Sequence, residues 1–322
     1  MTAVDTKRSD LRFRIRLNLQ SIVGRAYPRI IGANREPSWI FFETILPLLG
    51  IAAYVFIYQF FADQAILAAL GGRCGDHLCS GAAEQAQYLA QAKANLNAYV
   101  ATVILGGTMV AFWLNVLWSM ASQLYWEKEI GNLQLYMMAP MSRMALLGGM
   151  AVGGMFMTSV RALTTLGVGI LVFGVVLNIV NPAMLLAVFF VTLVALYGMG
   201  MMFASLYLLW GREAWNLSAL MEEPIFFSSG FYFPAGGFGK IPGWGPYVLA
   251  AAAAVPATLG LDAMRQLVTP GAWGNTLWIL SVDLELGILL VLAVVFLILA
   301  RYALAYLEHL AKREGRLTSR HQ

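Results

Sequence analysis

The chain has 322 residues, of which 60% are hydrophobic and 12% are charged. A soluble globular protein of this length needs more polar surface, so the composition excludes that class and indicates an integral membrane protein. The formal net charge of +4 does not indicate a nucleic-acid partner, because in a membrane protein the placement of lysine and arginine reports orientation.

Apolar runs fill nearly the whole chain. A membrane-spanning helix needs about 20 apolar residues, and six runs meet that length: 39–61, 98–121, 145–177, 183–209, 215–234 and 282–305. We therefore expect an all-α integral membrane protein with six transmembrane helices. The expected organisation is a basic segment 1–37, a transmembrane domain 38–310 and a basic tail 311–322.

Lysine and arginine gather at the two ends of the chain. They are Lys7, Arg8, Arg12, Arg14, Arg16, Arg25, Arg29 and Arg35 before the first run, and Lys312, Arg313, Arg316 and Arg320 after the last. Loops expected on the other side carry only Arg73, Lys93, Lys240 and Arg265. Because basic loops stay inside, we expect both termini to be cytoplasmic and the protein to lie in the plasma (cytoplasmic) membrane. The first apolar run begins too late and is too long for a secretory signal peptide.

Residues 10–19 alternate apolar and polar side chains, a pattern that taken alone predicts a strand. A lone strand would have no partner, whereas an amphipathic helix in the membrane plane, kinked or divided at Pro28, would lay apolar side chains on the interface. Such a helix either anchors the chain to the inner leaflet or contacts a partner subunit.

The external loop 62–97 holds the chain's two cysteines, Cys74 and Cys79. A disulfide, two free thiols, or a metal site with Asp76 and His77 are the alternatives, and four ligands within six residues rarely close around one ion. We expect no metal. The Ala/Gln-rich end of this loop predicts a short external helix, continuous with the second span.

The stretch from Gln123 to Arg143 is a short charged and amphipathic interruption between the second and third apolar runs. Glu127, Lys128 and Glu129 are costly to place in hydrocarbon, so the stretch should lie at a water-facing surface. Its leucine, tyrosine and methionine side chains still supply an apolar side, as in an interfacial helix. A connector helix of this kind can press on a partner.

The same stretch carries Glu-x-Glu-x-Gly at 127–131, then Leu133, Ala139-Pro140 and Ser142-Arg143. This pattern resembles the first cytoplasmic connector, or coupling helix, of ABC-2 type transporter permeases. A second motif, SGFYFP at 229–234, is similar to the Ser-Gly-x-x-x-Pro that follows the fifth span of that family. The order of the spans extends the resemblance over most of the chain.

The resemblance implies a permease that pairs with a second permease copy, as a homodimer or a related heterodimer, and docks on separate ABC ATPase subunits. ATP and Mg²⁺ would be bound by the ATPase, and no cofactor by this chain. The family also has short re-entrant helices before its last span, where this chain has a Gly/Pro-broken segment at 243–268. The residues that match the ATPase-coupling connector are Glu127, Lys128, Glu129, Gly131, Leu133, Pro140 and Arg143.

Small residues in span three, Gly148, Gly149, Gly153 and Gly154, predict close helix packing, either inside the subunit or in a dimer. The short turn 178–182 predicts that spans three and four form a tight hairpin.

Three charged residues lie about midway along their apolar runs: Arg161 in span three, and Glu222 and Glu223 in span five. A charge at the bilayer centre is costly, so Arg161 should turn inward and pair with one of the glutamates. The alternatives are a polar patch that contacts cargo, or a cytoplasmic position of the glutamates.

The resemblance implies the permease subunit of an ATP-driven exporter, and we expect its cargo to be amphipathic: a drug, lipid or glycoconjugate. The chain has no Gly-x-x-x-x-Gly-Lys-Ser/Thr loop, so it should not hydrolyse ATP itself. A gradient-driven carrier is the alternative. Such carriers often have two halves of related sequence, whereas the halves 39–177 and 183–305 of this chain do not look alike. A membrane-embedded enzyme would need convergent reactive residues, and the three histidines, His77, His309 and His321, lie outside the apolar runs.

Overall fold

The computed structural model describes residues 11–34, 37–210, 213–272 and 276–313, and these are helical apart from connecting segments and one small hairpin. The basic residues Lys7, Arg8, Arg35, Arg316 and Arg320 lie outside the described residues. The elements are α2 (Leu11–Asn34), α3 (Pro37–Leu70), β1 (Arg73–Cys74), β2 (His77–Leu78), α4 (Ala82–Leu114), the π-helical η1 (Asn115–Met120), α5 (Gln123–Ile130), α6 (Asn132–Met138), α7 (Arg143–Phe173), α8 (Pro182–Trp210), α9 (Ala214–Ser228), the 3-10 helix η3 (Ala235–Lys240), α10 (Gly245–Ala253), α11 (Pro256–Val268) and α12 (Val282–Arg313).

Among the described residues, five helical stretches are long and apolar enough to cross a membrane: Leu48–Leu70, Ala82–Ile130, Arg143–Phe173, Pro182–Tyr207 and Val282–Arg313. The helices α10 and α11 are bent by 95° and would make a sixth span if they are counted together. The all-α prediction is therefore confirmed, and the chain has the architecture of a multi-pass membrane protein.

The fifth expected span, 215–234, is shorter than the sequence predicted. Helix α9 has 15 residues and ends at Ser228, because the chain turns at Gly230 with a left-handed φ of 65°. At 1.5 Å per residue α9 is about 22 Å long, less than the roughly 30 Å of a hydrocarbon core.

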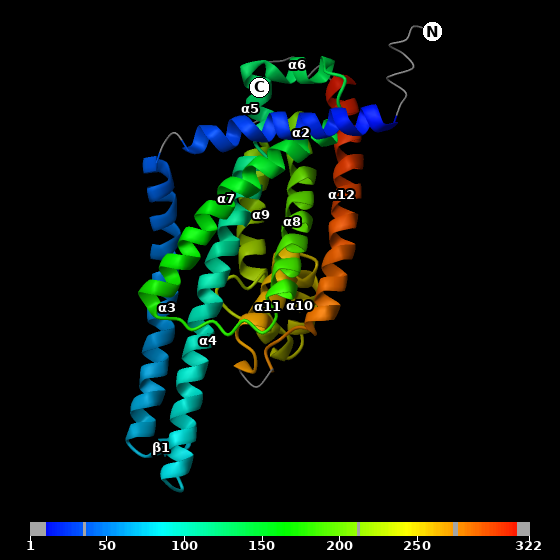
Figure 1. Ribbon diagram of the computed structural model, residues 1–322. Helices are drawn as coiled ribbons and strands as arrows, with labels where there is room; N and C mark the ends of the chain where they lie inside the picture. Colours follow the sequence, from blue (N-terminus) through cyan, green and yellow to red (C-terminus); the bar gives the residue numbers. More distant parts are fainter. Residues whose placement is uncertain (1–10, 35–36, 211–212, 273–275, 314–322) are drawn as a thin grey trace.

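The helices form a bundle with two distinct ends (Figure 1). Helix α2 lies across one end, where α5, α6, the start of α7 and the end of α12 are also found; we call this the connector end. The hairpin of α3 and α4 projects beyond the other helices at the opposite end, the hairpin end.

Residues 11–19, whose alternation fits a strand, lie within α2, so the helical alternative is the one that the structure adopts.

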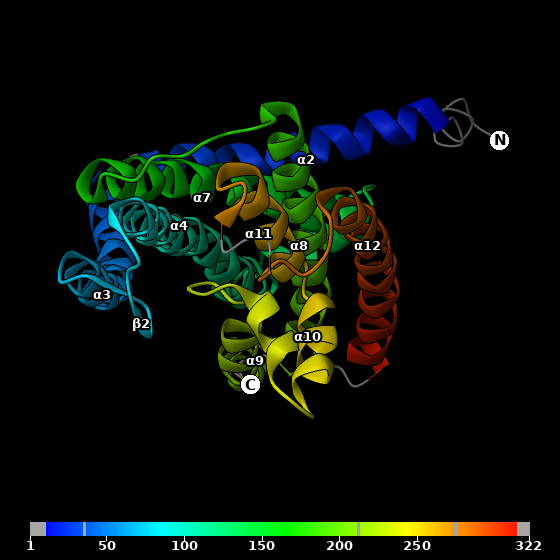
Figure 2. The same ribbon diagram turned by 90° about the horizontal axis from the view of Figure 1, so that it is seen from below.

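Helix α4 is the most buried of the spans, and Trp113, Phe112 and Leu117 of α4 and η1 lie in the core. Helices α10 and α11 lie near α9 and α12 when the bundle is seen from below (Figure 2).

The predicted tight hairpin of spans three and four is wrong. Helix α8 packs mainly along α12, and α7 packs on α2 and α4. The connection between α7 and α8 is extended and binds the end of α11: the Asn178 and Val180 amides donate to the Val268 and Leu267 carbonyls over 2.9 and 3.1 Å.

Candidate coupling surface and inner cavity

The helices α5 and α6 form a connector between α4 and α7. Helix α5 ends at Gly131, whose φ of 90° is a left-handed conformation that glycine adopts without strain. Gly131 thus separates α5 from α6, which lies across the connector end beside α2 (Figure 1).

The Glu127 carboxylate is held inside the chain. Arg25 Nη2 of α2 forms an ion pair with Glu127 Oε1, and Asn132 Nδ2 donates to Glu127 Oε2 over 3.0 Å. Arg25 Nη1 also donates to the Tyr136 hydroxyl over 3.2 Å. Burial raises the pKa of Tyr136, so this hydroxyl stays protonated at neutral pH. Glu127 is only 8% exposed. In this conformation the carboxylate joins α2 to the connector, and a direct contact of Glu127 with a partner protein stays a prediction.

The other connector residues divide between an inner and an outer face. Lys128 and Leu133 are buried, at 6% and 3% exposed, and Glu129 is partly buried. The outer face carries large apolar side chains: Trp126, Ile130, Leu135 and Met138 are 49%, 67%, 62% and 75% exposed. The exposed surface of the connector is thus more apolar than acidic.

Arg143 joins the connector to the last helix. After the exposed turn at Pro140, Ser142 caps α7 by accepting from the Ala145 amide over 3.1 Å. Arg143 Nε then lies 2.7 Å from Glu308 Oε2 of α12, and Lys312 Nζ lies 2.6 Å from Glu308 Oε1. The connector is therefore tied to α2 directly and to α12 through the start of α7.

The glycines of α7 place α2. A Cβ at Gly149 would lie 2.7 Å from Arg25 Cβ and 2.9 Å from the Ile22 carbonyl oxygen, and one at Gly153 would lie 3.2 Å from Arg29 Cδ. These glycines pack helices within the subunit. The close crossing carries Arg25 to the connector and Arg29 to η1.

A cavity of about 740 Å³ lies between α2, α4, η1, α5 and α7, and we call it the inner cavity. In η1 the Ala121 amide bonds to the Val116 carbonyl five residues back, over 3.1 Å. Such π-helical turns are frequent at functional sites. The lining residues are Arg29, Leu114, Asn115, Trp118, Ser119, Ser122, Gln123, Trp126, Met157 and Arg161.

Hydrogen bonds hold several of these lining side chains. Asn115 Oδ1 accepts from the Tyr197 hydroxyl over 2.9 Å, and Arg29 Nη2 donates to Ser119 Oγ. Burial lowers the pKa of the Arg29 guanidinium, although the Tyr197 hydroxyl partly opposes this shift. Desolvation therefore makes the charged form of Arg29 less favourable than it would be in water.

The structure places the three predicted intramembrane charges in different surroundings. Arg161 is partly buried in the wall of the inner cavity, and Glu223 is exposed. Glu222 Oε2 accepts from Trp118 Nε1 over 2.9 Å. Trp118 also lines the cavity, so Glu222 lies next to it, and the pairing of Arg161 with a glutamate stays a prediction.

Sequence reasoning missed a buried polar cluster where α11 meets α12. Asp262 and Glu285 are 1% and 0% exposed, and Gln266 Nε2 lies 3.1 Å from Asp262 Oδ2 and 3.3 Å from Glu285 Oε2. Ionising both of these buried carboxyl groups together is unfavourable, because like charges repel in a low dielectric. The signal available in the sequence was an acidic residue within the apolar 243–268 segment.

Arg265, counted above among the external basic residues, is 1% exposed. It donates to the Thr102, Phe231 and Phe233 carbonyls over 3.1, 2.8 and 3.2 Å. These bonds fix the SGFYFP turn against α4, where a Cβ at Gly106 would lie 1.4 Å from the Phe231 oxygen. The turn of the second motif is therefore held by α11 and α4.

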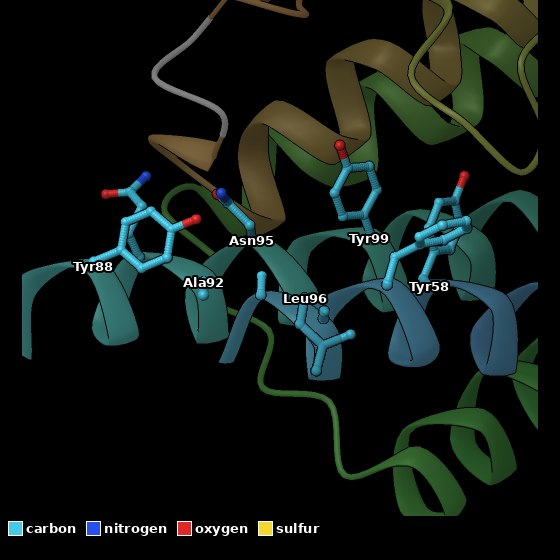
Figure 3. Close-up of a pocket in the computed structure, with 10 residues that line it drawn as sticks. Tyr58, Tyr88, Ala92, Asn95, Leu96 and Tyr99 are labelled. Carbon is cyan, nitrogen blue, oxygen red and sulfur yellow. The ribbon is translucent and has the colours of Figure 1, made fainter. Parts of the chain in front are cut away.

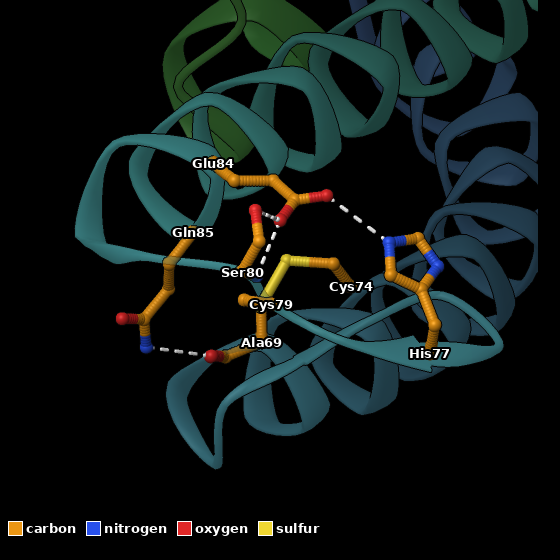
Figure 4. The surroundings of a disulfide bond; sticks show 7 residues. All are labelled: Ala69, Cys74, His77, Cys79, Ser80, Glu84 and Gln85. Carbon is orange, nitrogen blue, oxygen red and sulfur yellow. Dashed lines mark hydrogen bonds and ion pairs between the residues drawn. A yellow bond between two sulfur atoms is a disulfide. The ribbon is translucent and has the colours of Figure 1, made fainter.

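At the hairpin end Cys74 and Cys79 form a disulfide (Figure 4). Their sulfur atoms are bonded to each other and are therefore not the thiolates that a metal site would use. Glu84 accepts from the Ser80 amide and hydroxyl, both at 2.5 Å, and lies 3.0 Å from His77 Nε2. These contacts fasten the small hairpin of β1 and β2 to the start of α4.

A second pocket, of about 380 Å³, lies between α3 and α4 towards the hairpin end (Figure 3). Tyr58 and Tyr99 stack there with ring centroids 4.7 Å apart, and Tyr88, Gln91 and Asn95 add polar groups. Its lining is aromatic and uncharged, in contrast to the inner cavity.

No family model matches the chain, and no curated protein sequence matches it significantly. The resemblance to ABC-2 type permeases therefore rests on the two motifs and on the order of the helices.

Proposed function

We propose that the chain is the permease subunit of an ATP-driven exporter of the ABC-2 type, that it forms the pathway with a second copy, and that separate ATPase subunits drive it. The observation that carries the proposal is the connector. Its inner face is tied to α2, the α7 helix that follows it is tied to α12 through Arg143, and its outer face exposes Ile130, Leu135 and Met138. Apolar side chains held on a rigid element are what a docking partner buries.

The contacts of the connector give a path for coupling. A partner that moves the connector also moves α2 through the Arg25–Glu127 pair, and moves the start of α7 and the end of α12 through Arg143 and Glu308. Since these contacts span three elements, the connector end would shift as one body, which is the kind of motion that alternates access. The energy comes from nucleotide binding in the ATPase, because only differential binding shifts such an equilibrium.

Docking can be tested by co-purification of the chain with candidate ABC ATPases, beginning with any that a neighbouring reading frame encodes. The triple substitution Ile130→Ser, Leu135→Ser and Met138→Ser should raise the dissociation constant by about 100-fold, since each buried anchor contributes about 1 kcal/mol or more. The matched control is Leu78→Ser, which changes a side chain 74% exposed at the hairpin end. A folded triple variant that retains the ATPase at the wild-type ratio would contradict the proposal.

A gradient-driven carrier is the second candidate, and the buried Asp262 and Glu285 favour it because carriers use such carboxyl groups to bind protons. Purified chain in liposomes separates the two. A carrier transports with a proton gradient and no ATPase, whereas the permease requires the ATPase and ATP and is unaffected by a protonophore.

A further inference from the structure

The inner cavity has an excess of basic side chains. Of its ten described lining residues, Arg29 and Arg161 are basic and none is acidic. The Glu222 carboxylate lies behind the cavity wall, where it accepts from Trp118. Its one negative charge does not balance the two positive charges of the arginines. In a partly desolvated site this charge attracts an anion more strongly than it would in water.

Polar atoms of the cavity lining have unused hydrogen-bonding capacity. Arg29 Nη1 is buried and has no acceptor among the described residues, while Arg29 Nη2 is held by Ser119. A buried guanidinium nitrogen without an acceptor is costly, and an anionic oxygen would remove that cost. Gln123 Oε1 likewise has no donor in the described part of the chain.

The rest of the cavity wall is apolar and aromatic. Leu114, Met157, Trp118 and Trp126 make up this part. A volume of about 740 Å³ falls within the roughly 300–1,000 Å³ of small-molecule sites. The cavity therefore combines a cationic region with an apolar region, and a ligand that fits both has an anionic head and an apolar tail.

We infer that the inner cavity binds an amphiphile with one phosphate or carboxylate headgroup, and that Arg29 and Arg161 hold this headgroup. The apolar tail lies against Trp118, Trp126 and Met157. That this amphiphile is the transported cargo rests on the proposed function. That it binds in the inner cavity depends on this chain alone.

The test uses the full chain purified without any ATPase, in nanodiscs of zwitterionic phosphatidylcholine. Radiolabelled dodecyl phosphate is the probe, and empty nanodiscs give the background. Unlabelled dodecyl phosphate should compete at least about tenfold better than neutral dodecyl maltoside or cationic dodecyltrimethylammonium, the factor that a charge-assisted hydrogen bond supplies. Equal competition by all three would overturn the inference.

Two substitutions place the site. Arg29→Gln and Arg161→Gln should each weaken dodecyl phosphate binding by about tenfold or more. Arg73→Gln, at an exposed arginine of the hairpin end, should leave it unchanged. If Arg29→Gln does not fold, Arg29→Lys keeps the charge and should retain most of the affinity. Loss of binding in Arg73→Gln as large as in the cavity variants would overturn the assignment.

Competition then identifies the source of the headgroup. Phosphatidylglycerol in the disc should displace the probe if the site takes a membrane lipid, and retained binding in its presence points to a single-chain ligand; both results keep the anionic amphiphile. Inorganic phosphate that competes as well as dodecyl phosphate would show that the tail contributes nothing and would overturn the inference. Failure of the ATPase to co-purify would contradict the proposed function and leave these binding results unaffected.

Discussion

At the scale of single residues, the acidic motif of the connector has a structural role that its charges alone do not reveal. Glu127, Lys128 and Glu129 predicted a water-facing element; α5 and α6 lie at the connector end of the bundle, and their exposure to water stays a prediction. The sequence could not show that Glu127 is buried, because its partner Arg25 lies 102 residues earlier in the chain. Pairs so distant in sequence are set by tertiary packing, here the α2–α7 crossing.

Removing the Glu127 carboxylate should destabilise the protein. The Glu127→Ala variant leaves the Arg25 guanidinium partly buried without its anion, and we expect a loss of about 1–3 kcal/mol. Thermal unfolding of the purified chain measures the change. The control is Asp76→Ala, at an exposed carboxylate of the hairpin end, which should be nearly neutral. An unchanged melting temperature in Glu127→Ala would show that the pair does not hold α2 to the connector.

At the scale of elements, the packing of α2 on α7 depends on glycine. The Gly149→Ala substitution adds a methyl group 2.7 Å from Arg25 Cβ and 2.9 Å from the Ile22 backbone oxygen. Overpacking of this kind costs about 1–3 kcal/mol. The matched control is Gly167→Ala on the same helix, where an added Cβ meets no heavy atom within 4 Å apart from its own chain neighbours and helix backbone. The gain in helix propensity of about 0.4–1 kcal/mol should therefore appear alone.

Thermal unfolding of the two glycine variants should therefore change in opposite directions. Equal stabilisation of both would show that α2 does not pack on α7 as closely as described.

The sequence predicted most helices but not which helices are neighbours. Long apolar runs identify spans by length, so α3, α4, α7, α8 and α12 were found. Helix α8 is apolar on all faces, so its sequence marks no side for α7 or α12 to cover. The early end of α9 depends on the turn at Gly230, and that turn is fixed by hydrogen bonds from Arg265, far along the chain.

At the scale of the whole molecule, the inner cavity could be predicted only in part. Arg161 was singled out because charge in an apolar run is costly, whereas Arg29 was one of many basic residues near the N-terminus. The crossing of α2 over α7 and the π-helical turn in η1 bring Arg29 and Arg161 to the same cavity. Neither feature has a signal that can be read from a single sequence. Asp262 and Glu285 were missed for the same reason, since they meet only where α11 packs on α12.

The distribution of charge over the two ends of the bundle predicts the orientation of the molecule. The described arginines of α2, together with Lys312 and Arg313 of α12, belong to the connector end (Figure 1). Because positively charged segments remain on the cytoplasmic side, the connector end should face the cytoplasm and the disulfide hairpin should lie outside.

Single-cysteine labelling tests this orientation in a Cys74→Ser, Cys79→Ser background. The disulfide closes a loop with a sequence separation of 5, so its removal should affect the local turn and little of the global stability. Leu78→Cys and Met138→Cys introduce thiols at positions 74% and 75% exposed, on the hairpin and connector ends. A membrane-impermeant maleimide should label Leu78→Cys in intact cells and Met138→Cys only after permeabilisation. The reverse pattern would invert the topology and place the connector where no cytoplasmic ATPase could reach it, which would refute the proposed coupling as well.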